Sequence, residues 1–426
     1  MKQLKIAVWH NLPSGGGKRA MYDQVRGLTR LGHYVEAWCP PTANQTFLPL
    51  NTLIKEHIVS LENPPSMSQS WLGRRQHRAW ETGRRMKAME DHCRRCAEDI
   101  STGGFDLLLA HPCVLFRASP IANYVYLPNV LYLAEPYREL YEAWPQLPWV
   151  APQREYRPFS RSYWNGLIWE LLKLNNKRVQ VRNELAWVKS FDQILVNSLF
   201  SRESVLRAYN VDSRVCYLGI DTENLRPTGA AKESFVIGLG NIAFNKRVSL
   251  AVEAMGAIPA DRRPRLIWVG NWADQGYLAC IKKKAKELGV EFVEKVLVPD
   301  EDLRGLLSRA AVMIYTSHLE PFGFAPLEAN ACGTGVVALA EGGVRETVCH
   351  QDSGVLVSSS NPEEFADELM KFTGNLQFAA EFGRRSRAYV EQHWSQEKAL
   401  KRLEAELQRV INNKHGRIKK EANSQL

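Results

Sequence analysis

The chain has no uncharged apolar run long enough to cross a bilayer. A membrane helix needs roughly 18 to 20 such residues, and the best candidate, residues 105–116, is interrupted by Asp106 and His111. The apolar strand near the N-terminus, which follows residues 2–5, is too short for the core of a signal peptide. These absences favour a cytoplasmic protein.

Cysteine is also sparse, with eight residues scattered over 426. Four of them lie in apolar surroundings, which indicates buried thiols rather than a disulfide framework. The single C-x-x-C, formed by Cys93 and Cys96, has no second ligand pair, so it favours a structural role over zinc binding or redox chemistry. No D-x-D motif or comparable oxygen-ligand cluster stands near the glycine-rich loops discussed below, and we expect no metal and no other cofactor.

Acidic charge is scarce in the first half relative to basic charge. Residues 1–226 contain 29 Lys and Arg against 21 Asp and Glu, and the remainder contains 26 against 25, so the formal charge of +9 divides into about +8 and +1. The basic excess is densest in residues 71–96, where tryptophan and methionine are interleaved and where four of the arginines are Arg74, Arg75, Arg84 and Arg85. Such a segment is either a solvated helix with its aromatic side on the core, or a surface for anionic lipid or an acidic acceptor. No nucleic-acid motif accompanies the charge, so nucleic acid is not an expected partner.

Alternating strand and helix patterns predict an α/β fold with two Rossmann-like, doubly wound domains. The chain is long enough for two cores. A Pro/Gly linker signal at residues 224–229 predicts a boundary between an N-terminal domain, residues 1–226, and a C-terminal domain, residues 227–395. Ligands of such sheets bind beyond the carboxyl ends of the strands.

The most informative segment is residues 317–328, which read SHLEPFGFAPLE. The apolar residues 310–315 before it predict a buried strand, and residues 327–332 predict a helix with Pro326 at its first position. The loop between the strand and the helix is therefore expected at the positive end of a helix dipole.

This loop has the properties of a phosphate-binding loop. Gly323 can adopt φ > 0, so the N–H groups around it can bind an anion without a metal. Glu320 at the end of the strand and Glu328 in the first turn of the helix can accept hydrogen bonds from ligand hydroxyls. The combination predicts a nucleotide-sugar site.

The same residues resemble the donor loop of the retaining glycosyltransferases of family 4, which reads E-P-F-G-x-x-x-x-E. The resemblance continues through residues 333–338, 342–346 and 353–357. It implies that the first glutamate binds sugar hydroxyls, that the loop amides bind the diphosphate and that the second glutamate binds the ribose. Those roles fall on Glu320, on Phe322, Gly323 and Phe324, and on Glu328.

The resemblance also implies the two-domain GT-B fold. In that fold the last helix, for which residues 396–410 are the candidate, crosses back to the N-terminal domain. The acceptor then binds in the N-terminal domain and the nucleotide sugar in the C-terminal domain, with the active site in the cleft between them.

A second glycine cluster, residues 238–243, matches the dinucleotide fingerprint G-x-G-x-x-G/A. The next predicted strand ends in Gly270 and Asn271 without an acidic residue for a ribose, which disfavours NAD. The segment instead resembles the family's G-R-x-x-x-x-K turn, which implies that Lys246 pairs with the donor diphosphate and acts in catalysis. Asn241 stands at the arginine position, and the adjacent Arg247 can supply the second charge if its side chain turns into the cleft.

The N-terminal half offers two further candidates. Residues 14–19, SGGGKR, follow the first strand, and Gly16 and Gly17 can form a nest of N–H groups that resembles the family's first glycine loop, facing the donor. His111 closes a predicted strand where family members carry a histidine beside the donor sugar, so the resemblance implies a catalytic role.

Together these features predict a retaining enzyme that moves a hexose from a nucleoside-diphosphate sugar to a hydroxyl of a glycan or glycolipid precursor, for example in polysaccharide or lipopolysaccharide biosynthesis. No nucleophile with a paired base is apparent. The protein is expected in the cytoplasm, with a peripheral contact at an anionic membrane as an open possibility. Two alternatives remain: a GT-B epimerase or hydrolase of nucleotide sugars, and a catalytically silent nucleotide-sugar-binding protein.

Overall fold

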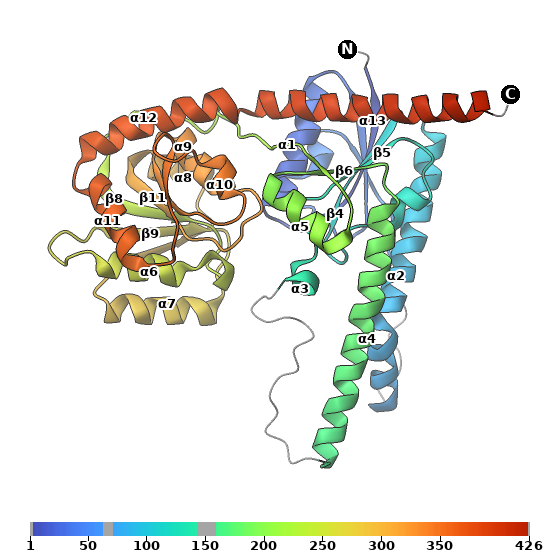
Figure 1. Ribbon diagram of the computed structural model, residues 1–426, viewed down its shortest axis with the longest axis horizontal. Helices are drawn as coiled ribbons and strands as arrows, with labels where there is room; N and C mark the ends of the chain where they lie inside the picture. Colours follow the sequence, from blue (N-terminus) through green and yellow to red (C-terminus); the bar gives the residue numbers. More distant parts are fainter. Residues whose placement is uncertain (1–2, 63–70, 143–158, 425–426) are drawn as a thin grey trace. The chain divides into compact units, whose positions relative to one another are not determined.

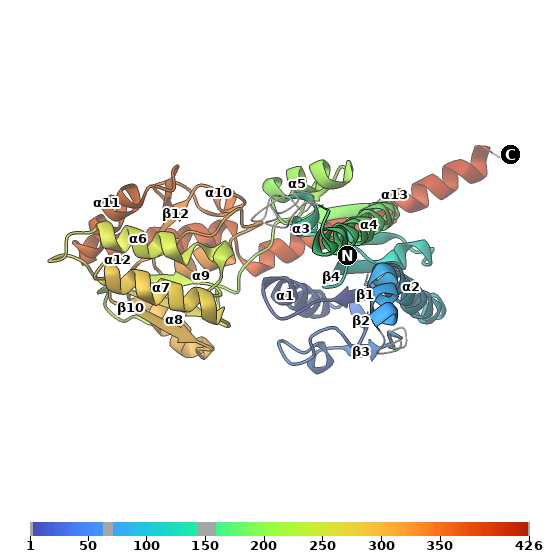
Figure 2. The ribbon, with the colours of Figure 1, turned by 90° about the horizontal axis from the view of Figure 1, so that it is seen from below.

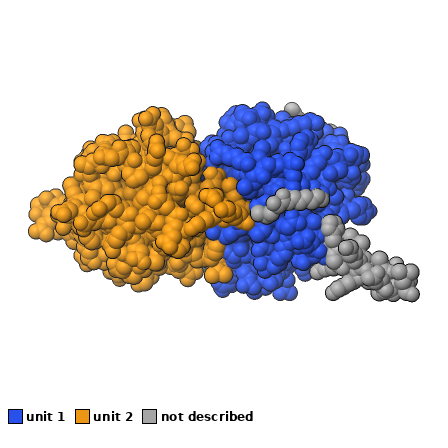
Figure 3. All heavy atoms as spheres, turned by 90° about the horizontal axis from the view of Figure 1, so that it is seen from above, with its two compact units in different colours: residues 1–197, 202–216, 402–426 blue, residues 198–201, 217–401 orange. Residues whose placement is uncertain are grey.

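The computed structural model describes residues 3–62, 71–142 and 159–424, with the side chains of residues 71–80 and 415–424 excepted. The chain divides into two compact units, which Figure 3 colours separately. Unit 1 comprises residues 1–197, 202–216 and 402–426, and unit 2 comprises residues 198–201 and 217–401.

Unit 1 contains a seven-stranded sheet in which every pairing is parallel, in the order β3-β2-β1-β4-β5-β6-β7. The strands are β1 (Lys5–Asn11), β2 (Tyr34–Cys39), β3 (Lys55–Ile58), β4 (Leu107–Cys113), β5 (Asn129–Tyr132), β6 (Gln193–Val196) and β7 (Arg214–Val215). β1 and β4 are buried almost throughout because helices cover both faces of a parallel sheet. The strand order reverses between β1 and β4, which makes their carboxyl ends the expected binding edge.

The helices of unit 1 are connected in the βαβ manner (Figure 1). They are α1 (Gly16–Arg30), α2 (Trp71–Thr102), α3 (Arg138–Tyr141), α4 (Arg161–Lys189) and α5 (Leu199–Tyr209), with the short 3₁₀ helices η1 (Leu50–Thr52) and η2 (Pro120–Asn123). Helices α2 and α4 lie side by side, and Asn183 of α4 donates a hydrogen bond to Met86 of α2.

Unit 2 contains a six-stranded, wholly parallel sheet in the order β10-β9-β8-β11-β12-β13. Its strands are β8 (Glu233–Leu239), β9 (Arg265–Gly270), β10 (Phe292–Val296), β11 (Ala310–Tyr315), β12 (Val336–Leu339) and β13 (Gly354–Val357). The order reverses between β8 and β11. The loops after these two strands are therefore the ones that line the binding edge of unit 2.

From β8 to β13 the helices of unit 2 alternate with its strands, and α11 and α12 follow β13; Figure 2 shows most of these helices. They are η3 (Phe244–Lys246), α6 (Val248–Ala257), α7 (Gln275–Glu287), α8 (Asp300–Arg309), α9 (Phe324–Ala331), α10 (Val344–Thr347), α11 (Pro362–Thr373) and α12 (Leu376–His393). The last helix, α13 (Gln396–Ser424), begins in unit 2, and its residues from Arg402 onward belong to unit 1.

The two parallel sheets with helices between their strands confirm the predicted α/β class. β3 was not predicted, because its sequence KEHI has no apolar alternation or run. None of the helices in the described part of the chain is both long and apolar enough to cross a membrane.

Candidate active site

The turn after β8 brings Lys246 to the carboxyl edge of the unit 2 sheet. Gly240 follows the strand with φ 145°, a conformation that other residues rarely adopt. The Lys246 side chain runs across this glycine, where a Cβ would lie 3.3 Å from Lys246 Cε. At Gly238 a Cβ would meet the Trp268 ring at 2.2 Å. Packing of this turn therefore explains the two glycines that match a dinucleotide fingerprint.

Hydrogen bonds hold this turn against the loop after β11. Thr316 Oγ1 is 2.8 Å from the carbonyl oxygen of Lys246 and 3.0 Å from that of Arg247. The His318 N–H donates to the Asn245 carbonyl at 2.9 Å. Because β8 and β11 are neighbours in the sheet, the two loops meet at the point where the strand order reverses, and the backbone of Lys246 is fixed there.

The loop after β11 carries Glu320 and ends at α9. Gly323, with φ 98°, caps a helix that runs from Phe324 to Ala331. The expectation that Pro326 opens this helix and that Glu328 lies in its first turn is wrong, because these residues are the third and the fifth of the helix. Proline is tolerated there since the first N–H groups of a helix have no intrahelical partner.

A short ion pair joins the two loops. Lys246 Nζ lies 2.6 Å from Glu320 Oε2, and both side chains are partly exposed. Such a pair adds at most about 1 kcal/mol to stability, so its main effect is to orient the two groups. Two residues predicted to be catalytic therefore lie in contact, on the loops that meet before α9.

The glycine turn after β12 fixes the backbone of Glu320. The Gly343 N–H donates to the Glu320 carbonyl at 2.8 Å, and Gly342, with φ 64°, is so close that a Cβ would lie 2.4 Å from the same oxygen. On the next residue, the Pro321 carbonyl accepts a hydrogen bond from Ser198 Oγ at 2.6 Å. A side chain at either glycine would collide with the backbone of the loop that carries Glu320.

The other predicted donor residues of unit 2 differ in their surroundings. The Phe322 side chain is buried, with its ring centroid 5.1 Å from that of Phe324 and 5.6 Å from that of Trp394. Both phenylalanines use their rings for packing. Asn241 is exposed directly after the β8 turn, and Glu328 is buried within α9.

Arg247 is already engaged by other side chains. It has φ 45°, its guanidinium lies 3.1 Å from Glu341 Oε1, and a second nitrogen lies 2.6 Å from His318 Nδ1. His318 Nδ1 is in turn 2.7 Å from Glu341 Oε2. Neither His318 nor Glu341 was predicted as a site residue, although both stand in or beside predicted motifs. The positive charge of Arg247 is thus paired with the Glu341 carboxylate of the same unit.

In unit 1 the predicted residues lie at the carboxyl edge around β1 and β4. Gly15 has φ 132° and caps α1 without a side-chain hydrogen bond, so Gly16 and Gly17 open the helix with exposed backbone. His111 is a buried residue of β4. Burial, followed by the charges of His10 and Lys18, lowers the pKa of His111 to about 3, so the imidazole is neutral at physiological pH.

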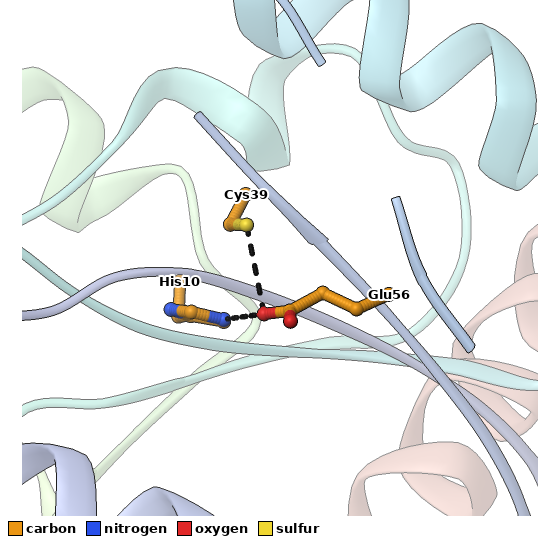
Figure 4. A group of neighbouring side chains, drawn as sticks. All are labelled: His10, Cys39 and Glu56. Atoms are coloured by element: carbon orange, nitrogen blue, oxygen red, sulfur yellow. Dashed lines mark hydrogen bonds and ion pairs between the residues drawn. The ribbon is translucent and has the colours of Figure 1, made fainter. Parts of the chain in front are cut away.

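A buried polar cluster that no motif indicates lies at the same edge. Figure 4 shows His10 and Cys39 pointing toward Glu56, whose Oε1 is 3.0 Å from His10 Nε2 and 3.6 Å from Cys39 Sγ. These three ligand atoms lie within 4.8 Å of one another, close enough for one metal ion. However, burial first and Glu56 second raise the pKa of Cys39 to about 12, so a metal would have to displace a firmly held proton and lie near the charge of Lys18. Hydrogen bonding to Glu56 accounts for the cluster without a metal.

The model of the family described as glycosyl transferases group 1 matches residues 221–389. A D-inositol 3-phosphate glycosyltransferase of Saccharomonospora viridis is 28% identical over 236 residues, which cover 50% of this chain and 55% of the relative. An N-acetyl-alpha-D-glucosaminyl L-malate synthase of Bacillus anthracis is 26% identical over 219 residues, or 51% and 57% of the two chains. The chain thus spans just over half the length of these curated relatives.

Solved structures extend the similarity to both sheets. Sucrose-phosphate synthase from Thermosynechococcus elongatus has a TM-score of 0.69 and 17% identity, covering 97% of this chain and 100% of that one. Anabaena HepE in complex with UDP has a TM-score of 0.67 and 17% identity, covering 95% and 100%. At this identity the likeness shows the fold, and it confirms the predicted GT-B architecture. Sequence similarity to the glycosyl transferases group 1 is thus found in residues 221–389 of this chain.

Proposed function

We propose that the protein is a retaining hexosyltransferase that uses a nucleoside-diphosphate sugar. The observation that carries this proposal is the contact between Lys246 and Glu320, 2.6 Å apart, on the two loops that meet before α9. A cation and a helix amino terminus suit a diphosphate, and the adjacent carboxylate suits sugar hydroxyls. The match of residues 221–389 to the glycosyl transferases group 1 supports the same reaction.

In this proposal the protein stabilises the leaving diphosphate electrostatically. Lys246, the N–H groups around Gly323 and the α9 dipole accept the charge that develops as the bond between the anomeric carbon and the phosphate oxygen breaks. The acceptor oxygen bonds to that carbon on the face from which the diphosphate departs, and its proton passes to the departing phosphate oxygen. Glu320 holds the sugar by its hydroxyls during this exchange.

The donor and the acceptor are proposed from the relatives. Solved complexes of HepE contain UDP and UDP-glucose, so UDP-glucose is the first donor to test. Two curated relatives are named for D-inositol 3-phosphate and for L-malate, both small hydroxylated anions. With the basic excess of residues 1–226, this supports an anionic acceptor, and a glycolipid precursor with an acidic head group belongs to the same class.

We also propose that α4 brings unit 1 to an anionic membrane. Trp164, Ile168 and Leu171 are all exposed at helical spacing, and the same helix face continues to the exposed Arg178 and Arg182. An apolar stripe that continues into arginines fits a bilayer interface, where each basic side chain contributes about 1 kcal/mol. Of the four arginines singled out in the sequence, Arg74 and Arg75 lie outside the described side chains.

The decisive experiment measures release of nucleoside diphosphate from UDP, GDP and ADP sugars with and without acceptor. D-Inositol 3-phosphate and L-malate are the first acceptors. Release that requires acceptor and yields a glycoside of retained anomeric configuration supports the proposal. Release without acceptor indicates a hydrolase, isomerised sugar without release indicates an epimerase, and binding without turnover over the whole panel indicates a silent binding protein.

A further inference from the structure

The buried nitrogen atoms at the carboxyl edge of the unit 1 sheet are incompletely bonded. His10 on β1, Lys18 in the first turn of α1 and His111 on β4 are each at most 2% exposed. Among the described residues, His10 Nδ1, Lys18 Nζ and His111 Nε2 have no hydrogen-bond partner. Three unpartnered nitrogens from three elements at one sheet edge are unusual, because buried polar groups in folded proteins are nearly always bonded.

The proton on His10 can be assigned from its neighbour. Burial raises the pKa of Glu56, but the hydrogen bond and charge of His10 and the charge of Lys18 outweigh it, so the net pKa is lowered and Glu56 is ionised. An ionised carboxylate only accepts, hence His10 Nε2 carries the proton that it donates to Glu56. His10 Nδ1 is then a free acceptor and requires a donor such as a hydroxyl.

Lys18 has the opposite requirement. Its ammonium group can only donate, and burial without a hydrogen-bond acceptor is costly for a cation. Burial lowers the pKa of Lys18, while the nearby Glu56 and Cys39 oppose this effect. Both contacts of the Glu56 carboxylate, with His10 and with the Cys39 thiol, are made by Oε1, and no hydrogen bond joins Lys18 Nζ to Glu56. Lys18 therefore lacks the anionic oxygen that would bond to it directly.

We infer that Lys18, His10 and His111 bind the acceptor of the proposed transfer reaction through an anionic oxygen group next to a hydroxyl. Lys18 Nζ donates to the anionic oxygen, with the uncapped amino end of α1 adding positive potential. His10 Nδ1 accepts from the hydroxyl, and His111 Nε2, on the neighbouring strand β4, is the third unpartnered nitrogen at this edge. The ligand class is a small hydroxylated anion, either a polyol phosphate or a hydroxy acid. This inference deepens the proposed function and rests on it for the ligand's role as acceptor.

The test follows the imidazole signals of His10 and His111 in protein labelled at histidine, assigned with His10→Gln and His111→Gln. The titrants are D-inositol 3-phosphate, L-malate and neutral myo-inositol. We expect one of the two anions to shift both signals in the wild type and to bind about tenfold or more weakly to Lys18→Met. Lys55→Met is the matched control, because Lys55 precedes Glu56 on β3 and its side chain is 68% exposed. It should behave as the wild type does.

Thermal unfolding without ligand gives a second readout. Removing an unpaired buried cation should raise the unfolding temperature of Lys18→Met, whereas removing a structural partner of Glu56 would lower it. Lys18→Arg keeps the charge and provides a folded variant should the methionine variant misfold; it should retain a weakened response. Neither readout uses the sugar donor or measures turnover. The inference can therefore fail while sugar transfer is demonstrated, and anion binding at Lys18 can be found while sugar transfer is not.

Four results would overturn the inference. The histidine signals do not respond to either anion, or neutral myo-inositol shifts them equally. Lys18→Met is less stable and titrates as the wild type does. UDP alone shifts the histidine signals and Lys18→Met abolishes that shift, which would assign Lys18 to the donor diphosphate instead of the acceptor.

Discussion

At the scale of single residues, Lys246 and Arg247 in the site of unit 2 are each paired with a carboxylate before any ligand binds. Lys246 is paired with Glu320, and Arg247 is paired with Glu341. A diphosphate that approaches Lys246 has to share this cation with Glu320, which frees carboxylate oxygen for sugar hydroxyls. We therefore expect Lys246 to bind the diphosphate and Arg247 to stay paired with Glu341.

Replacing Glu320 by glutamine should abolish most transfer while nucleoside-diphosphate binding survives. The amide keeps the size of the side chain and loses the charged acceptor, a loss of about 1.5 to 3 kcal/mol or roughly one to two decades of rate. Steady-state turnover and calorimetric binding of UDP measure the two effects separately. A folded variant with unchanged turnover would remove Glu320 from the proposed mechanism.

Replacing Lys246 by alanine should weaken binding of the nucleoside diphosphate about tenfold or more, since a charge-assisted hydrogen bond to phosphate is lost. Arg247→Ala should weaken it less, because the guanidinium is committed to Glu341 and His318. Calorimetry on the two variants and on Asn241→Arg, which should tighten binding, compares the three positions. Equal losses at Lys246 and Arg247 would mean that the arginine turns to the ligand after all.

The buried histidines predict a pH dependence of unit 1 stability. Burial, as the largest cause, lowers the pKa of His92 to about 4 and that of His111 to about 3. An unfolded histidine titrates near pH 6.5, so below this value the unfolded chain binds the extra protons. Stability should fall by about 1.4 kcal/mol per pH unit for each histidine between pH 6.5 and its folded pKa, and be insensitive to these groups above pH 7. Hydrogen exchange of β4 amides at pH 7 and pH 5 measures this.

His92→Gln should reduce the pH dependence and leave the remainder to His111 and to His10, whose pKa burial also lowers. The exposed His350 of unit 2 supplies a control, because His350→Gln should not change the slope. A slope that is the same in the wild type and in His92→Gln would contradict a neutral buried His92.

At the scale of elements, α4 has one face on which large apolar side chains are exposed to solvent. Its other face packs on the unit 1 core through Val179 and Trp187, whereas Trp164 and Leu171 are 49% and 57% exposed. We expect the protein to co-sediment with vesicles that contain anionic lipid at low salt and to be released at high salt. Trp164→Ser with Leu171→Ser should weaken binding even at low salt. A wild type that stays in the supernatant at low salt would show that α4 does not bind lipid.

The sequence predicted strands well wherever a buried strand is a continuous apolar run. Residues 310–315 and 265–270 are such cases, and β11 and β9 match them. It failed at β3, whose KEHI residues carry charge at the sheet edge, and at the start of α9, where proline marks the first turn without fixing its first residue. The local sequence pattern is enough to predict β9 and β11. The position of β3 and the first residue of α9 depend on contacts with residues far away in the chain.

The candidate site divides in the same way. Glu320 and Lys246 stand in motifs of fixed spacing, so each could be singled out before the structure was known. Lys18 stands in the glycine-rich segment 14–19 without a pattern that marks it, and His10 and Glu56 stand in no motif. Only the parallel register of β1, β2 and β3 brings His10 and Glu56 to one edge. Burial and the lack of hydrogen-bond partners are properties of that assembly, and no sequence pattern encodes them.

At the scale of the whole molecule, α13 is a helix that both units share. It starts in unit 2, and the side chains that it buries from Arg402 onward belong to unit 1. Leu407 is fully buried, and the carboxylate of Glu404 lies 3.1 Å from His33 in the interior of unit 1. Because this part of the helix contributes to the core of one unit only, a cavity there should be felt by that unit.

Leu407→Ala should therefore destabilise unit 1 by about 2 to 5 kcal/mol, the usual cost of a leucine-to-alanine cavity in a core. Unit 2 has its own core, built on β8, β11 and α11, and should keep its stability. Differential scanning calorimetry with hydrogen exchange assigned to each sheet measures the two units separately, and Gln408→Ala, on the next and more exposed position of α13, is the matched control. If both sheets lose protection equally in Leu407→Ala, the two units unfold as one cooperative body and α13 couples them. If only β1 and β4 lose it, the helix serves unit 1 alone.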